Sequence, residues 1–197
     1  ERLLEIVPSH DSGEIATFAS EYRFPVTACE PGRRYRARVR MKDATGRWST
    51  WSSAVEFTAG AFDPSAYASR IVVSELMYHA AGPSAAELAT AAALNPPQAW
   101  NDDSFDYIEL RNVSTEPVDL AGFRLTAGVD FVFPSPTVVA AGASILVVAN
   151  ADAFAARHGA GRPIAGVWDA KDRLSNGGET LTLQVGQATP AVFSFAY

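Results

Sequence analysis

The sequence contains very little cysteine and no long hydrophobic run. Cys29 is the single cysteine among 197 residues, which excludes an internal disulfide framework and a cysteine metal cluster. No apolar run approaches the roughly 18 residues of a membrane-spanning helix, so we expect no membrane insertion. A Gly-rich phosphate loop and a Gly-x-Ser-x-Gly elbow are also missing, and the histidines lack metal-ligand spacing. We therefore predict that the chain is not an enzyme.

Positive charge is scarce in the longer part of the chain. The whole sequence has 16 Lys and Arg against 22 Asp and Glu, a net charge of −6. Residues 1–62 hold nine basic and eight acidic side chains, whereas residues 63–197 hold seven and fourteen, which gives +1 and −7. An acidic surface repels phosphates, so we expect no nucleic-acid partner.

The clearest positive pattern is DYIELRNVSTEPVDLAGFRLT, residues 106–126. Its apolar side chains fall at alternate positions, as in Ile108 and Leu110 or Phe123 and Leu125. Alternation by two, interrupted by Ser-Thr-Glu-Pro and by a glycine, predicts short consecutive β-strands with one buried face. Similar segments recur at residues 131–133, 145–149 and 179–185, and the fold class they favour is an all-β sandwich.

Residues 35–41 alternate apolar and basic side chains and predict a strand, with Arg36, Arg38 and Arg40 on one face. Trp48 and Trp51 follow three residues apart, so they point the same way in an extended segment. We predict that the arginines interleave with the two indoles as a cation–π ladder. We favour a structural role for this ladder over a partner-binding surface.

The run YRARVRMKDATGRWSTWSS resembles the end of a fibronectin type III domain, and its Trp-Ser-x-Trp-Ser segment is similar to the box of cytokine-receptor domains. Such domains have about 100 residues and seven strands, so residues 1–60 correspond to a partial domain. The chain also begins and stops abruptly, and we expect it to be part of a longer polypeptide. An incomplete sandwich has an open edge, which allows either a monomer or a strand-exchanged dimer.

A small, turn-prone linker at residues 61–69 separates this part from a second domain at 70–197. Residues 71–78 predict a largely buried strand, and 145–149 a central one. Ser84 and Glu87 form a capping-box pattern before a short helix, and Asn150 is placed to cap a second helix that stops at Gly159. Asn176-Gly177 predicts a two-residue hairpin.

Six fragments occur in the order of a lamin tail domain: IVVSELMYH, DYIELRN, VDLAGFRLT, FVFP, ILVVAN and LSNGGETLTL. The second domain therefore resembles that family, with an insertion at residues 80–104. The resemblance implies an immunoglobulin-like β-sandwich. Together the two modules look like segments of large secreted bacterial proteins, which implies an extracellular or cell-surface location. Neither a catalytic function nor a filament-associated role carries over to this chain.

One acidic cluster is a candidate metal site, because carboxylates in a loop are suitable ligands for Ca²⁺. It consists of Asp102, Asp103 and Asp106, followed by Glu109 and with Glu75 as a further candidate. Their spacing is not that of the twelve-residue calcium loop, and we favour a solvated acidic loop over a calcium site. Asn112, at a strand end, is expected to bond backbone groups of a turn rather than a ligand.

We expect a non-catalytic structural or interaction module without cofactors, used for spacing, adhesion or presentation of a neighbouring domain. Its partner would be a protein or a cell surface. The alternative is a carbohydrate- or cell-surface-binding module, assisted by calcium if the acidic loop binds it. That alternative requires an exposed aromatic platform, for which Trp100, Trp168 and Tyr78 are the candidates.

Overall fold

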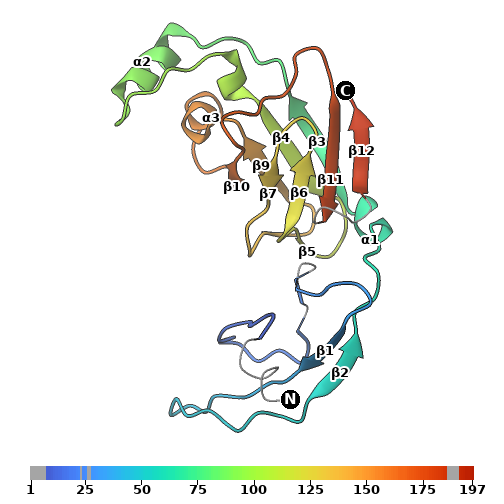
Figure 1. The fold of residues 1–197 in the computed structure, drawn as a ribbon. Helices are drawn as coiled ribbons and strands as arrows, with labels where there is room; N and C mark the ends of the chain where they lie inside the picture. The colour runs from blue at the N-terminus through green and yellow to red at the C-terminus, as the bar shows by residue number, and fades with distance from the viewer. Residues whose placement is uncertain (1–7, 23, 26–27, 186–190) are drawn as a thin grey trace. The chain divides into compact units, whose positions relative to one another are not determined.

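The computed structural model describes residues 8–22, 24–25, 28–185 and 191–197. It divides the chain into two compact units, Glu1–Phe62 and Asp63–Tyr197. The strand expected at residues 3–7 lies outside the described residues. Figure 1 shows the helices and strands of both units.

In the first unit, β1 (Arg34–Ala37) pairs antiparallel with β2 (Val55–Thr58). Beyond β1 the pairing continues with the Trp-Ser-Thr-Trp-Ser segment, because the backbone N–H groups of Ser49 and Ser52 bond the carbonyls of Met41 and Val39. Phe57 packs against the rings of Tyr35 and Phe24, at 5.7 and 5.8 Å between centroids. Among the described residues of this unit none is buried.

The second unit is built on two four-stranded sheets, which Figure 1 shows one in front of the other. One sheet has the order β10-β9-β4-β3, and the other the order β12-β11-β6-β7. A separate short ladder joins β5 and β8. The strands are β3 (Ile71–Met77), β4 (Tyr107–Asn112), β5 (Val118–Asp119), β6 (Phe123–Thr126), β7 (Phe131–Val132), β8 (Val138–Val139), β9 (Ser144–Val148), β10 (Ile164–Val167), β11 (Thr180–Val185) and β12 (Ala191–Ala196).

Alternation in the sequence decides which side chains form the core of this sandwich. Ile108 and Leu110 of β4 and Leu125 of β6 have no exposed surface, and neither have Leu181 and Leu183 of β11. Intervening residues such as Arg111 and Thr180 are exposed. The predicted all-β fold and the central position of the 145–149 strand are therefore confirmed.

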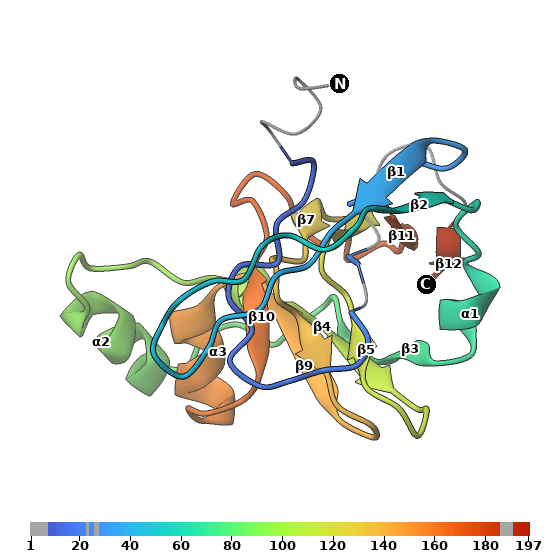
Figure 2. The ribbon, with the colours of Figure 1, turned by 90° about the horizontal axis from the view of Figure 1, so that it is seen from below.

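α3 (Ala151–His158) packs against the β10-β9-β4-β3 sheet, where Phe154 contacts Tyr107 and Leu146, and α2 (Ala85–Ala93) packs against α3. A 3₁₀ helix at Asp102–Phe105 also lies against α3. In Figure 2, α2 and α3 lie on one side of this unit, and α1 (Ser65–Ala68) lies on the opposite side. None of the helices in the described ranges is long and apolar enough to cross a membrane.

Both helix caps follow the predicted chemistry. Ser84 accepts a bond from the backbone N–H of Glu87, whose carboxylate accepts one from the N–H of Ser84 at 2.7 Å. Asn150 accepts from the N–H of Ala153 at 2.9 Å, and Gly159 ends α3 with a φ of 86°. These contacts satisfy N–H groups that a helix start leaves unpaired, so the cap predictions are confirmed.

Two strand predictions were wrong. β3 was expected to be largely buried, yet it is the last strand of its sheet, and Ile71 is its one buried residue. Asn176 and Gly177 do form a turn, but it leads from a loop into β11 and does not join two paired strands. An apolar run cannot distinguish a central strand from an edge strand beside an apolar furrow, and a turn signal does not identify its flanking strands.

Candidate interaction site

An apolar furrow runs between the outer edges of the two sheets in the second unit. β3 is the last strand of one sheet and β12 is the last strand of the other. A cavity of about 540 Å³ lies between them, and its walls are mainly apolar. Its lining includes Ile71, Val73, Leu76, Phe193, Phe195 and Tyr197.

Strand register explains why these side chains face each other. Val73 and Leu76 lie opposite Leu110 and Ile108 of β4, which are fully buried. Phe193 and Phe195 lie opposite Leu183 and Leu181 of β11, which are also fully buried. Directly opposed residues of an antiparallel pair share a face of the sheet. The furrow is therefore the open flank of the sandwich core.

The furrow is bordered at one end by α1 and at the other by two tyrosines. α1 immediately precedes β3, contacts β3 and β12, and contributes Ala68 to the lining. At the other end, Tyr78 follows β3 and Tyr197 follows β12, and their rings are 4.8 Å apart. The Tyr197 hydroxyl donates to Glu179 at 2.8 Å, and burial with this bond raises the pKa of Tyr197. This anchoring fixes the end of the furrow.

The predicted aromatic platform is wrong for two of its three residues. Trp100 and Trp168 are buried, and Trp100 packs at right angles to Phe105 with centroids 5.9 Å apart. Because both indoles are buried, they cannot present a flat face to a sugar. Tyr78 is half-buried and belongs to the furrow.

The predicted acidic loop contains one unusual side chain. Asp102 and Asp103 lie half-buried in the 3₁₀ helix, while Asp106 is only 2% exposed, and neither of its oxygens has a hydrogen-bond partner among the described residues. Burial raises the pKa of Asp106 to about 7, and repulsion from the Asp103 carboxylate raises it further. The backbone N–H of Ala80 lowers this pKa, although it does not form a hydrogen bond with either oxygen of Asp106. Within the described ranges, no three His, Cys, Asp or Glu side chains form a group suited to a metal.

The Trp and Arg residues of the first unit form a stacked arrangement around one guanidinium. Arg40 lies 4.4 Å from the ring centroid of Trp48 and 4.6 Å from that of Trp51. The guanidinium of Arg36 donates a hydrogen bond to the Glu56 carboxylate of β2 at 2.9 Å. The hydroxyls of Ser49 and Ser52 accept bonds from the N–H groups of Met41 and Val39. These contacts hold the two extended segments together.

Asn112 is a structural residue, as predicted. Its amide NH₂ donates to the carbonyls of Glu116, Val139 and Ala140, at 2.7 to 3.2 Å. Its carbonyl oxygen accepts bonds from the N–H and the hydroxyl of Ser114. Asn112 is fully buried, and these bonds use its donors and acceptor on neighbouring turns.

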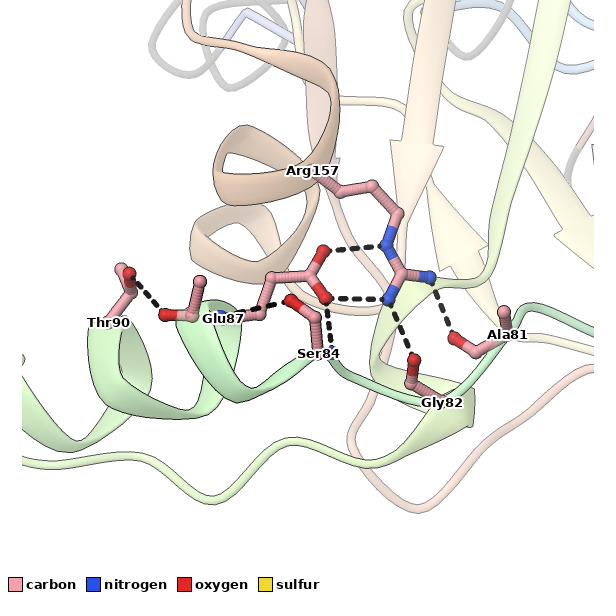
Figure 3. Close-up of polar contacts among 7 residues, drawn as sticks. Ala81, Gly82, Ser84, Glu87, Thr90 and Arg157 are labelled. Atoms are coloured by element: carbon pink, nitrogen blue, oxygen red, sulfur yellow. Dashed lines mark hydrogen bonds and ion pairs between the residues drawn. The ribbon is translucent and has the colours of Figure 1, made fainter.

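A cluster that the sequence did not reveal ties α2 to α3. Figure 3 shows the Arg157 guanidinium between the Glu87 carboxylate and the carbonyls of Ala81 and Gly82. It also lies 3.3 Å from the ring centroid of Phe105. The hydrogen bond from Arg157 is the main cause that lowers the pKa of Glu87 to about 2. The capping pattern at Ser84 was the only sequence signal here, and it did not indicate the partner 70 residues away.

Comparison with known protein families assigns both units. Residues 5–63 match a Rha78A-like, N-terminal immunoglobulin domain, and residues 64–193 match the Lamin Tail Domain. A search of curated proteins found no match. The order of the two matched domains is the predicted one, although the first family is described as immunoglobulin and not as fibronectin type III. Because the second match covers more than half of the sequence, the chain belongs to the lamin tail domain family, with an immunoglobulin-like domain preceding the lamin tail domain.

Proposed function

We propose that this chain is a non-catalytic structural and interaction module of a larger exported bacterial protein. Its role is to space or present a neighbouring domain and to adhere to a protein partner at the outside of the cell. The observation that carries this proposal is the division into two compact units, each matched by an immunoglobulin-like family. Such domains commonly serve as spacers and binding scaffolds in surface proteins.

Two further observations support an interaction role. The second unit has an exposed apolar furrow, and exposed apolar surfaces of this kind mark interaction sites. In the first unit, stacking and side-chain bonds stiffen the segment around Trp48 and Trp51. The resemblance of residues 1–60 to fibronectin type III domains also supports an interaction role. A carbohydrate-binding role is not favoured, because Trp100 and Trp168 are buried.

The spacing role is tested by a distance measurement between the two units. Cys29 is the only thiol in the chain, and Ala170→Cys adds one on an exposed loop of the second unit. Spin labels on both cysteines report the distribution of distances by pulsed electron resonance. We expect one narrow distribution, because a spacer must hold its domains at a fixed separation.

The matched control places both labels in the second unit. It combines Ala170→Cys with Thr115→Cys, both at exposed positions, and Cys29→Ser removes the native thiol. Its distribution gives the width that the labels alone produce. A distribution between the units several times broader than this control would contradict the spacing role.

A further inference from the structure

The two strands that border the furrow differ in how well their outer edges could pair with another strand. β3 has a register irregularity between Val73 and Glu75 and carries the charge of Glu75. β12 has the sequence AVFSFA, with no charge and no proline, and its pairing with β11 is regular from Phe193 to Ala196. Charges and bulges protect sheet edges from pairing. β3 has both forms of protection, whereas the last four residues of β12 have neither.

The outer edge of β12 is also unpaired and accessible. β12 is the last strand of its sheet, and no strand in the described part of the chain pairs with its other side. Phe195 is 38% exposed, and Ser194 and Ala196 are also exposed. An edge strand presents a row of backbone N–H and C=O groups, to which an extended peptide can add.

From these observations we infer that the β12 edge binds an extended segment of a partner protein as a fifth strand of the sheet. The segment lies in the furrow between β12 and β3, and this inference rests on the interaction role proposed above. Every second side chain of the bound segment is apolar and enters the furrow, where it contacts Phe193 and Phe195 on one side and Val73 and Leu76 on the other. The remaining side chains lie on the outer face beside Ser194 and Thr182.

Length and charge define the segment further. The four regularly paired residues of β12, Phe193 to Ala196, span about 13 Å at roughly 3.3 Å per residue, so about four residues of the segment pair with this edge. Residues 63–197 carry seven basic and fourteen acidic side chains, so basic residues next to the apolar ones favour association. The Ser194 and Thr182 hydroxyls, which bond each other at 2.8 Å, match small polar side chains on the outer face.

The test uses a labelled probe peptide, Lys-Val-Thr-Val-Thr-Phe-Lys, and the full chain, with binding measured by fluorescence anisotropy. A peptide of the same composition, Lys-Val-Val-Thr-Thr-Phe-Lys, breaks the alternation. We expect the alternating peptide to bind at one site per chain and the second peptide to bind at least about tenfold more weakly, because it cannot direct all its apolar side chains into the furrow. Equal affinities would overturn the inference.

Two substitutions locate the site. Phe195→Ser removes an apolar anchor from the furrow, and Val132→Ser makes the same kind of change on β7, at the opposite edge of the same sheet, where Val132 is 55% exposed. We expect the first substitution to weaken peptide binding about tenfold or more and the second to leave it unchanged. Equal effects of the two substitutions, or none from Phe195→Ser, would overturn the inference.

Backbone methylation keeps the test decisive if Phe195→Ser impairs folding. One peptide is N-methylated on its apolar residues and another on its threonines, and both are tested with the unaltered chain. Successive N–H groups of a strand point to opposite sides, so one methylated peptide loses binding and the other keeps it. Binding of both would show apolar contact without strand pairing and would overturn the inference.

The furrow could instead hold a second copy of this chain. Sedimentation over a range of concentrations distinguishes the two occupants. A dimer that forms with rising concentration and is lost in Phe195→Ser would assign the furrow to a second copy and overturn the peptide partner. Failure of any of these binding tests leaves the distance measurement on Cys29 and residue 170 unaffected, so it does not decide the spacing role.

Discussion

The two units are stabilised in different ways. The second has a core of fully buried side chains shared by two sheets, such as Ile108, Leu125 and Leu183. In the first, none of the described residues is buried, and the contacts are side-chain bonds to the backbone, ring stacking and ion pairs such as Arg36 with Glu56. Burial of apolar surface is the main source of folding free energy. The comparison teaches that two immunoglobulin-like units can differ widely in how much apolar surface they bury, and the first unit is therefore expected to be the less stable.

The largest expected effect is on the core of the second unit. Leu125→Ala removes a fully buried side chain from β6 and should lower the free energy of unfolding by about 2–5 kcal/mol. Urea unfolding followed by tryptophan fluorescence separates the units, since Trp100 and Trp168 are buried in the second and Trp48 and Trp51 are exposed in the first.

The control for this prediction is Val132→Ala on the exposed face of β7, which should change the free energy of unfolding by less than about 0.5 kcal/mol. If Leu125→Ala shifted the unfolding transition of the first unit as much as that of the second, the two units would not unfold independently, and the prediction would be contradicted.

A smaller effect concerns the buried carboxyl of Asp106. Its pKa is raised from 3.8 to about 7, so its protonated form stabilises the fold fully below pH 3.8, and this contribution is lost as the pH rises through about 7. Asp106→Asn keeps the shape without the charge. We expect it to raise the free energy of unfolding by about 1–4 kcal/mol at pH 8 and to change little at pH 4.

Urea unfolding at both pH values measures this difference. Asp103→Asn is the comparison, because repulsion from Asp103 is only the second cause of the raised pKa, and it should give a smaller gain. An Asp106→Asn variant with the same pH dependence as the unaltered chain would be inconsistent with a buried, unpaired carboxylate.

The ion pair between α2 and α3 gives the opposite pH dependence. The pKa of Glu87 is lowered from 4.5 to about 2, mainly by Arg157, so its contribution is present above pH 4.5 and is lost as the pH falls through about 2. Glu87→Gln should lower the midpoint of thermal unfolding of the second unit at pH 6, and the difference from the unaltered chain should shrink towards pH 2.

Glu116→Gln, at an exposed turn position, is the matched control and should leave the midpoint unchanged at both pH values. A difference for Glu87→Gln that persists undiminished at pH 2 would exclude the charge of Glu87 as its source.

The smallest effect is expected at the stacked arginine of the first unit. Trp48 and Trp51, which flank Arg40, are 42% and 54% exposed, and each exposed cation–π contact contributes about 0.5–1 kcal/mol. Arg40→Ala should therefore destabilise the first unit by about 1–2 kcal/mol. The measurement is the transition reported by Trp48 and Trp51, and Arg33→Ala, an exposed ion pair with Glu30, should change it less. Equal destabilisation by Arg40→Ala and Arg33→Ala would argue against a stabilising stack of Arg40 on the two tryptophans.

Local patterns in the sequence predicted much of the fold. Alternation over residues 106–126 identified β4, β5 and β6, and Ser84 and Asn150 marked the starts of α2 and α3. These features depend on neighbours within a few residues, so the sequence contains their signals directly.

Burial and edge position could not be predicted in the same way. Trp100 and Asp106 looked exposed because they lie in a polar segment, yet contacts from distant parts of the chain bury both. The furrow was missed because the apolar pattern of β3 is the same whether its outer edge is paired or open. Arg157 and Glu87 are 70 residues apart, and no local pattern relates them.

The central claim is that β12 is an open edge ready to accept a strand, and hydrogen exchange followed by mass spectrometry tests it most directly. Amide exchange is measured in the full chain with and without the alternating peptide, and the two edges of one sheet are compared. We predict that the peptide slows exchange in residues 191–196 of β12 and leaves β7, residues 131–132, unchanged. No slowing in β12, or equal slowing in both strands, would contradict the claim.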